Sequence, residues 1–425
     1  MAITALPRPS RLPGTSRLFP TAAPAPAAAT APPVRRVPLT VAALLGAALV
    51  GWVWSQHGAQ RGVFALLGMG LGAALFHSRF GFTSAWRQLV AVGNGSGLRA
   101  HAVLLGTTAT LFALLIGTGT GLFGTTPAPS AGTLGVGLVA GAVLFGIGMQ
   151  LGGACASGTL YVIGSGQTSI VLTLGGFVTG SVLYAWAFPL VDDLPALPAF
   201  VLADHVGWAG SWAVTIALLA LIVAVTSAVQ RRRVPPPTAA PDSATGIARV
   251  LRGSWPMWVG AVVLAALGAG VLLTSGGAWG ITSAFTLWGS RLLQLVGLHP
   301  ESWAYWQQPA QAASLAGPVL ADRTSLTDLG IVLGAALAAA AGGAWTLHRR
   351  IPRNTAVAAV LGGVLMGIGA RLASGCNIGA YLAGIASGSA SGWVWGLAAL
   401  VGTWLGLRAR RLFGLAVPAP RDSAC

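Results

Sequence analysis

Long apolar stretches separated by short polar segments run along most of this 425-residue chain. Ten of them contain about 15–22 residues, close to the ~20 with which an α-helix crosses a bilayer. A membrane-spanning segment must satisfy its backbone hydrogen bonds internally, so the pattern predicts an all-α polytopic membrane protein. The ten expected spans are Leu39–Trp54, Gly62–Phe76, His101–Leu122, Thr133–Met149, Thr168–Phe188, Gly210–Val229, Trp255–Leu273, Thr327–Trp345, Thr355–Ala370 and Ser391–Leu407.

Four further segments are too short to be spans and are dense in glycine and hydroxyl residues. They begin near Gly81, Gly152, Gly280 and Gly375, and each lies beside a full span. Irregular backbone at membrane depth is tolerated only where it packs on protein or lines a cavity. We therefore expect four short re-entrant helices.

Two pairs of sequence motifs indicate that the chain is duplicated. The string Gly-Phe-Thr-Ser-Ala-Trp at 81–86 recurs as Gly-Ile-Thr-Ser-Ala-Phe at 280–285. The ten residues 146–155 recur at 367–376, with cysteine at the last position in both copies. Five expected spans separate the start of the first copy from the start of the second. Because five is odd, the second copy is expected to be inverted relative to the first.

Shifts in composition divide the chain into five parts. Residues 1–37 are rich in Pro, Ala and Arg and predict a disordered tail. We expect a first transmembrane repeat unit over 38–230 and a second, inverted unit over 255–413. The segment 231–254 starts with three arginines and contains three consecutive prolines, which predicts a cytoplasmic linker. Residues 414–425 are expected to form a C-terminal tail.

The distribution of charge explains why so basic a chain is not expected to bind nucleic acid. Only 8% of the residues are charged and 55% are hydrophobic, with a formal net charge of +16. All 24 Lys and Arg positions are arginine, and they are scattered between apolar stretches rather than gathered in a patch. With the N-terminus inside, twenty arginines fall on the inner side and four on the outer side. The positive-inside rule therefore predicts that both termini are cytoplasmic.

Two of the three cysteines, Cys155 and Cys376, occupy equivalent positions in the two copies. Each lies among glycines at the expected start of a short helix, where backbone can approach a ligand and unpaired N–H groups carry partial positive charge. This arrangement favours a small anion. No metal or cofactor is expected, and Cys425 has no assigned role. The other residues expected along the substrate path are Thr83, Ser84, Thr282, Ser283, Gln150, Arg371, Gly153, Gly158, Gly375, Asn377 and Gly379.

These features also have structural explanations. A buried cysteine is usually a small core residue, and Thr and Ser often bond the backbone of their own helix. Arg371 lies inside a span, five residues before Cys376, where the first copy has neutral Gln150. Charges inside a membrane are functional by default, but Arg371 can also bond a helix end. The equivalence of the two cysteines favours a functional role for them.

The strings around both cysteines resemble the YeeE/YedE family of bacterial inner-membrane proteins. The resemblance rests on residues 146–159, 367–381 and 384–393, and extends from about residue 39 to residue 413. It implies uptake of thiosulfate across the inner membrane by an hourglass-shaped protein whose cysteines hydrogen-bond the ion transiently. That role falls on Cys155 and Cys376. The family also implies a TusA-like sulfur carrier as a cytoplasmic partner.

The chain departs from the family in one respect, and two alternatives stay open. Family members can carry a further cysteine in the first short helix, where this chain has Thr83 and Ser84. The cargo can instead be a selenium species or another sulfur oxyanion. A membrane enzyme for sulfur transfer is the second alternative. It is less favoured, because neither cysteine has a Cys-x-x-Cys partner or a neighbouring histidine. No Walker A motif is present, so ATP is not expected to be the direct energy source.

Overall fold

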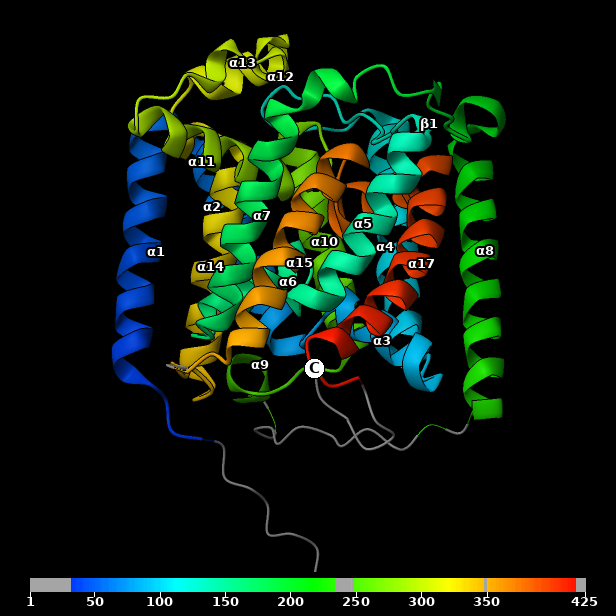
Figure 1. The fold of residues 1–425 in the computed structure, drawn as a ribbon, viewed down its shortest axis with the longest axis horizontal. Coiled ribbons are helices and arrows are strands. Elements are labelled where there is room, and N and C mark those ends of the chain that lie inside the picture. The colour runs from blue at the N-terminus through cyan, green and yellow to red at the C-terminus, as the bar shows by residue number, and fades with distance from the viewer. Residues whose placement is uncertain (1–31, 234, 236–245, 247, 348–349, 418–425) are drawn as a thin grey trace, which may run out of the picture. The chain divides into compact units, whose positions relative to one another are not determined.

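The computed structural model describes residues 32–233, 235, 246, 248–347 and 350–417 (Figure 1). The expected N-terminal tail up to residue 31, most of the expected linker, and the last eight residues with Cys425 lie outside the described residues. All ten expected spans and every expected site residue lie within them.

Ten helices of the described residues are long and apolar enough to cross a membrane. Each coincides with an expected span, apart from differences of a few residues at the ends. The all-α membrane fold predicted from the apolar pattern is therefore confirmed. The ten helices are α1 (Arg36–His57), α2 (Ala59–Ser78), α4 (Ser96–Thr118), α5 (Val136–Gly152), α7 (Ser169–Trp186), α8 (Ala203–Arg233), α10 (Met257–Ser275), α14 (Arg323–Ala341), α15 (Arg353–Leu372) and α17 (Ala390–Leu412).

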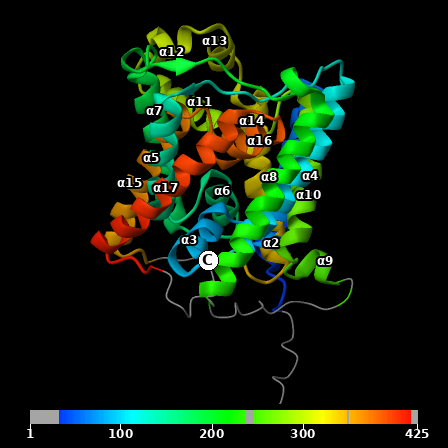
Figure 2. The same cartoon turned by 90° about the vertical axis from the view of Figure 1, so that its right-hand side faces the viewer.

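Short helices occupy the four glycine-rich segments, as expected. They are α3 (Phe82–Val92), α6 (Ala156–Gly164), α11 (Thr282–Leu295) and η4 (Asn377–Leu382), which continues into α16 (Ala383–Ala386). Of these, η4 is a π-helix, a rare form that is frequent at functional sites. In Figures 1 and 2, α3 lies at the lower end and α11 at the upper end. The equivalent short helices of the two copies are thus at opposite ends, as inversion requires.

Several small elements in the connections were not predicted from the sequence. Their segments contain only two to eight residues, too few for the apolar pattern to predict them. They are β1 (Leu134–Gly135), η1 (Phe188–Leu190), β2 (Ala196–Leu197), α9 (Ala248–Arg252), η2 (Pro300–Ser302), α12 (Ala304–Gln307), α13 (Pro309–Ala316) and η3 (Val319–Ala321). The two strands pair antiparallel, with Leu134 opposite Leu197. Figure 1 shows α12 and α13 at the upper end and α9 at the lower end.

Contacts between helices repeat when the two copies are exchanged. The packing of α2 on α14 has its counterpart in α10 on α4, and that of α5 on α17 in α15 on α7. Short helices follow the same rule, because α3 packs on α17 as α11 packs on α7, and α6 on α14 as α16 on α4. The duplication seen in the motifs thus extends to the arrangement of the helices.

The helices α1 and α8 lie at the margins of this arrangement (Figure 1). The first packs on α14 and α2, and the second packs on α4, the counterpart of α14. By these contacts α8 corresponds to α1, and each copy then has five spans. The expected boundary after residue 230 places α8 in the first unit, together with α4, on which it packs. As the counterpart of α1, however, α8 would be the first span of the second unit. Gly207, with φ 70°, breaks the start of α8.

Small residues bring the two copies together at α5 and α15. A Cβ added to Gly141 would lie 2.6 Å from the carbonyl oxygen of Gly369, and one added to Gly148 would lie 2.6 Å from that of Gly362. Helices in a membrane associate through close packing rather than through the hydrophobic effect, so such contacts favour glycine. This packing accounts for part of the high glycine content.

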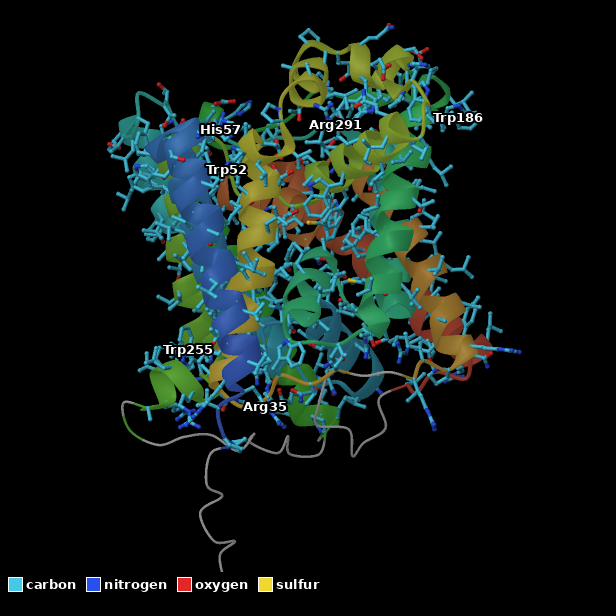
Figure 3. All side chains as sticks on the ribbon, turned by 90° about the vertical axis from the view of Figure 1, so that its left-hand side faces the viewer. Arg35, Trp52, His57, Trp186, Trp255 and Arg291 are labelled. Carbon is cyan, nitrogen blue, oxygen red and sulfur yellow. The ribbon has the colours of Figure 1, made fainter. Side chains whose placement is uncertain are left out.

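The ends of the helices divide between two faces. The start of α1 and the ends of α8 and α17 lie at the lower end in Figure 1. Figure 3 shows Arg35 and Trp255 at this same end, with His57, Trp186 and Arg291 at the opposite end. We call the lower face the arginine-rich end. Arg231, Arg232 and Arg233 lie there at the end of α8.

Candidate functional site

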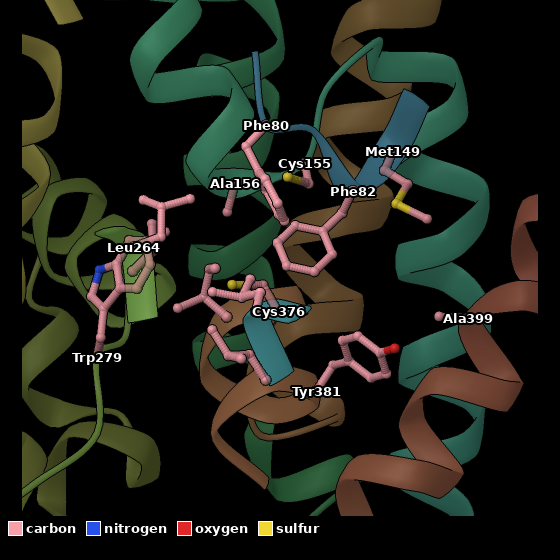
Figure 4. Packing of buried hydrophobic residues seen from close by; sticks show 14 of the residues in the cluster. Phe80, Phe82, Met149, Cys155, Ala156, Leu264, Trp279, Cys376, Tyr381 and Ala399 are labelled. Atoms are coloured by element: carbon pink, nitrogen blue, oxygen red, sulfur yellow. The ribbon is translucent and has the colours of Figure 1, made fainter. Parts of the chain in front are cut away.

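Cys155 and Cys376 occupy the same local position in the two copies. Cys155 is the residue before α6 and Cys376 is the residue before η4, both with extended backbone. Both are free thiols, only 2% and 1% exposed. Figure 4 shows both side chains in one buried cluster, beside Phe82 and Tyr381. The structure therefore places the two predicted residues at equivalent helix starts within a shared core.

A glycine with positive φ lies between each preceding long helix and its cysteine. Gly153 has φ +86° and Gly375 has φ +149°, values that side chains of L-residues rarely adopt. A Cβ at Gly375 would also lie 2.8 Å from the backbone nitrogen of Ala380, whereas Gly153 has open space around it. These two glycines turn the chain so that a short helix begins at the cysteine.

Polar groups surround each sulfur. The hydroxyl of Ser157 lies 3.5 Å from the Sγ of Cys155, and a Cβ at Gly158 would lie 3.5 Å from it. The backbone N–H groups of Ile378 and Gly379 lie close to the sulfur of Cys376, and so do Cys155 and the guanidinium of Arg371. Each thiol thus lies in a polar environment inside an apolar core.

The four hydroxyl residues of the motifs have different surroundings. Thr83 is buried, and its Oγ1 has no hydrogen-bond partner among the described residues. Ser84 donates to the carbonyl oxygen of Gly81 at 3.1 Å, which is the structural explanation given above. Thr282 accepts a hydrogen bond from Arg371. Ser283 is exposed and donates to Thr324 at 3.0 Å. Thr83 and Thr282 are therefore the better candidates for the path.

Gln150 and Arg371, at equivalent positions, both reach the short helix of their own copy. Gln150 donates through Nε2 to the carbonyl oxygen of Thr83 at 3.3 Å. Arg371 donates through Nη2 to the hydroxyl of Thr282. The end of a long helix is thus bonded to the start of a short helix in both copies, although only one copy uses a charge.

Two arginines near Gln150 were not singled out from the sequence. Arg87 donates through Nε to Oε1 of Gln150 at 2.9 Å. Arg410 donates through Nη1 to the carbonyl oxygen of Gln150 at 2.5 Å. Both had been counted only as markers of the inner side, because contacts across 63 and 260 positions leave no local signal. The first copy therefore also has a positive charge beside the position equivalent to Arg371.

Several buried polar atoms near the cysteines have no partner among the described residues. They are Oγ1 of Thr83, Nε of Arg371, and both side-chain amide atoms of Asn377, which is 0% exposed. Leaving a buried donor or acceptor unpaired costs about 1–3 kcal/mol, and such groups call for an explanation. All three residues were predicted path residues, so a transported ligand is one such explanation.

Elements carrying these groups meet around η4. The rings of Phe82, at the start of α3, and Tyr381 on η4 are 6.2 Å apart and nearly perpendicular. A Cβ at Gly379 would lie 3.9 Å from the Cα of Gly280, just before α11. Thiol, amide and hydroxyl groups thus come from the starts of the short helices, and Arg371 on α15 adds a guanidinium group. In the described part of the chain, no three His, Cys, Asp or Glu side chains form a metal-binding group. The converging groups are mostly hydrogen-bond donors, which suit an anion.

Comparisons with known proteins agree with this chemistry. The model of a family described as "Sulphur transport" matches residues 77–405, well over half of the chain. The chain is 36% identical over 162 residues to "Probable transporter YedE" of Escherichia coli (strain K12), a match covering 36% of this chain and 39% of that protein. It is 43% identical over 81 residues to "Thiosulfate transporter TsuA" of Spirochaeta thermophila, which covers 19% of this chain and 24% of that protein.

These individual matches cover well under two thirds of the relatives' own length, whereas the family match spans both cysteine motifs. The resemblance that the sequence showed at residues 146–159 and 367–381 is therefore confirmed. The chain belongs to the sulphur-transport (YeeE/YedE) family.

Proposed function

We propose that this protein takes up thiosulfate, or a closely related sulfur anion, into the cytoplasm of a bacterial cell through the inner membrane. The observation that carries the proposal is the pair of equivalent buried thiols, Cys155 and Cys376, at the starts of two short helices in one core. The relative named a thiosulfate transporter supports this cargo. The arginine-rich end would face the cytoplasm.

The chemistry of the path suits a soft dianion. Thiosulfate has oxygens that accept strong hydrogen bonds and a terminal sulfur that is large and polarisable. Helix starts and the guanidinium of Arg371 attract the charge, while a thiol is only a weak donor. Weak donors at the centre allow release as well as capture. Thiols must stay protonated for this role, since a thiolate would repel the ion.

A passing ion would meet the groups in a definite order. From the end opposite the arginine-rich end, Arg371 and Thr282 come first and Cys376 with Asn377 next. Cys155, Thr83 and Gln150 with Arg87 would follow. Because both thiols are almost completely buried, the side chains or short helices must move to let the ion pass. In inverted-repeat transporters, alternating access is largely a rocking or gating movement of one repeat against the other, which would also displace these groups.

Two alternative functions differ from this proposal, one in the ion that is transported and one in catalysing a reaction instead of transport. A selenium species or another sulfur oxyanion presents similar charge and differs in size and softness. A sulfur-transfer enzyme would need an accessible thiolate, whereas both thiols here are buried. The relatives are named transporters, which favours transport. A TusA-like carrier that receives the sulfur inside the cell remains part of the proposal.

The test is growth of a bacterium that lacks sulfate uptake, on thiosulfate as the sole sulfur source, with and without this protein. Growth that depends on the protein, together with entry of radiolabelled thiosulfate, is expected. Sulfite and selenite in place of thiosulfate, or as competitors, distinguish the cargos. If the protein reaches the membrane and neither growth nor uptake responds to it, the proposed function is wrong.

A further inference from the structure

Asp328 is a carboxyl group buried inside a membrane-spanning helix. It is the sixth residue of α14 and is 0% exposed. Neither Oδ1 nor Oδ2 has a hydrogen-bond partner among the described residues. An isolated carboxylate is very costly in such a place unless it is paired or protonated. Asp328 was not among the residues predicted to line the path.

The position of Asp328 on its helix brings it close to the proposed path. Residues four apart lie on the same helix face, so Asp328 shares a face with Thr324. The hydroxyl of Thr324 accepts a hydrogen bond from Ser283, the second residue of α11, at 3.0 Å. The first residue of α11 is Thr282, which is bonded to Arg371. Asp328 therefore lies about one helical turn from the elements that would receive the anion.

The other copy has a titratable residue in the corresponding place. His101 is the sixth residue of α4, the counterpart of α14, and is 1% exposed. Its ring lies 5.1 Å from that of Phe80 and 4.4 Å from that of Phe82, at the start of α3. Neither ring nitrogen makes a hydrogen bond of normal geometry in the described structure, although the backbone of Gly81 lies close to the ring. Each copy thus holds a buried titratable side chain beside its first short helix.

Charged neighbours do not neutralise Asp328. Among the described residues, the one ion pair joins His299 and Glu301. Arg323, the nearest cation along α14, donates to Ser275 on α10 instead, and η3 carries no titratable group. The titratable and charged groups on the elements packed against α14, and at its own start, are Arg36, His57, Arg61, His77, Tyr161, Arg249, Arg252, Arg291, Asp322 and Arg323.

The surroundings of His101 are similar in kind. The elements packed against α4 are α3, α8, α10 and α16, of which the last two carry no titratable group. Tyr381 is close to Phe82, which contacts the histidine. The charged or titratable groups on α3, α4 and α8 are Arg87, Arg99, Asp204, His205, Arg231, Arg232 and Arg233.

We propose that Asp328 binds a proton that is transported together with the anion, so that uptake is proton-coupled. This inference rests on the proposed function. In the cycle, the carboxylate takes a proton from the outer water when the path is open outward. The neutral acid then remains buried while the anion passes, and it loses the same proton to the cytoplasm. An entering dianion moves against an inside-negative potential, and each accompanying proton offsets one of its charges.

The full chain, purified and reconstituted into vesicles that contain a pH-sensitive dye, tests the proposal. With the wild-type protein, adding thiosulfate outside should acidify the lumen, and an acidic exterior should accelerate thiosulfate uptake several-fold. Asp328→Asn should lose both responses but still exchange internal for external thiosulfate, since exchange needs no net proton movement. Asp328→Glu keeps a titratable group and should restore coupling at least in part.

The matched control is Ser325→Ala, which removes another fully buried polar group from the same helix, one bonded to Trp288 at 2.9 Å. It should keep the response to the pH gradient. Wild-type uptake of thiosulfate without proton entry would overturn the inference while the proposed function stands. Absence of any wild-type thiosulfate flux would instead refute the proposed function. If Asp328→Asn fails to fold, a changed pH dependence of coupling in Asp328→Glu supports the assignment to Asp328 and an unchanged one overturns it. A coupled Asp328→Asn variant also overturns the inference.

Discussion

Arg371 on α15 donates a hydrogen bond to the hydroxyl of Thr282, the first residue of α11. In the other copy, Gln150 on α5 donates to the carbonyl oxygen of Thr83 on α3. The same link between a long and a short helix is thus made once with a charged group and once with a neutral one. Because the link itself can be neutral, the charge at Arg371 is available for another purpose.

If that purpose is to attract the anion, Arg371→Gln should weaken apparent affinity and leave protein abundance unchanged. Glutamine is a good helix former and reproduces the neutral link of the first copy. A hydrogen bond to a charged group contributes about 1.5–3 kcal/mol, so the apparent KM for thiosulfate should rise roughly tenfold or more. The loss should shrink at high ionic strength if the charge is accessible. Uptake kinetics normalised to membrane protein level measure both effects.

Arg410→Gln is the matched control for Arg371→Gln. Arg410 donates to the carbonyl oxygens of Gln150 and Ala416, which indicates a structural role at the ends of α5 and α17. Its loss leaves buried acceptors unpaired, at about 1–3 kcal/mol. Abundance should therefore fall with affinity unchanged. The same pattern in Arg371→Gln would assign Arg371 a structural role as well.

Cys155→Ala and Cys376→Ala should each reduce thiosulfate uptake by at least tenfold without loss of membrane expression. Both thiols are buried at equivalent helix starts, and alanine removes the donor but fits the space. Growth on thiosulfate and uptake of labelled ion are the measurements. Cys425→Ala, which alters the remaining cysteine, should behave as the wild type. Normal uptake by both path variants would exclude a relay between the thiols.

Gly375→Ala should destabilise the protein more than Gly153→Ala does. Both glycines have positive φ, which costs an L-residue on the order of 1–3 kcal/mol. At Gly375 the new Cβ would also lie 2.8 Å from the backbone nitrogen of Ala380, whereas nothing lies within 4 Å at Gly153. Thermal unfolding in detergent, followed by loss of monodispersity, should show the larger fall for Gly375→Ala. An equal fall would mean that the chain before η4 yields easily.

Reporter fusions can determine the orientation of the protein. Fusions at Thr126, Leu194 and Glu301 should report the periplasm, because these connections lie between spans on the side with few arginines. Fusions at Thr238 and after Leu412 should report the cytoplasm. A cytoplasmic signal at Glu301 would contradict the inversion and, with it, the shared site.

The spans and the short helices could be predicted because the membrane restricts which backbone structures can cross it. An apolar stretch of this length spans the membrane as a helix, so the apolar pattern alone located all ten candidate spans. The motif repeat then located α3, α6, α11 and η4. The grouping of α8 with α1 could not be read in this way, because the two helices share no motif and correspond only through their partners α4 and α14.

Only those parts of the candidate site that lie in local sequence motifs were predicted. The repeated, glycine-rich motifs were visible in the sequence, and they contain or directly precede Cys155, Cys376 and Asn377. The link from Arg87 to Gln150 joins residues 63 positions apart and was not visible. The burial of individual side chains could not be predicted either. Asp328 has polar neighbours in sequence such as Thr324 and Ser325, yet its side chain is fully buried. Partners of a polar group depend on tertiary packing, which a single sequence does not display.

Asn377 allows the most direct separation of structure from transport. Its amide is 0% exposed and lacks partners among the described residues, directly after Cys376. Asn377→Leu replaces it with an apolar side chain of similar size, which removes unpaired groups costing about 1–3 kcal/mol. The melting temperature should therefore stay the same or rise, while thiosulfate uptake falls, since the ion loses a donor beside the thiol.

Asn94→Leu is the matched control, because the Oδ1 of Asn94 accepts a hydrogen bond from the backbone N–H of Ser96 at 3.0 Å, at the start of α4. That variant should melt at a lower temperature and keep uptake per folded molecule. If Asn377→Leu behaves like Asn94→Leu instead, the amide of Asn377 has structural partners, such as ordered water, and does not bind the ion.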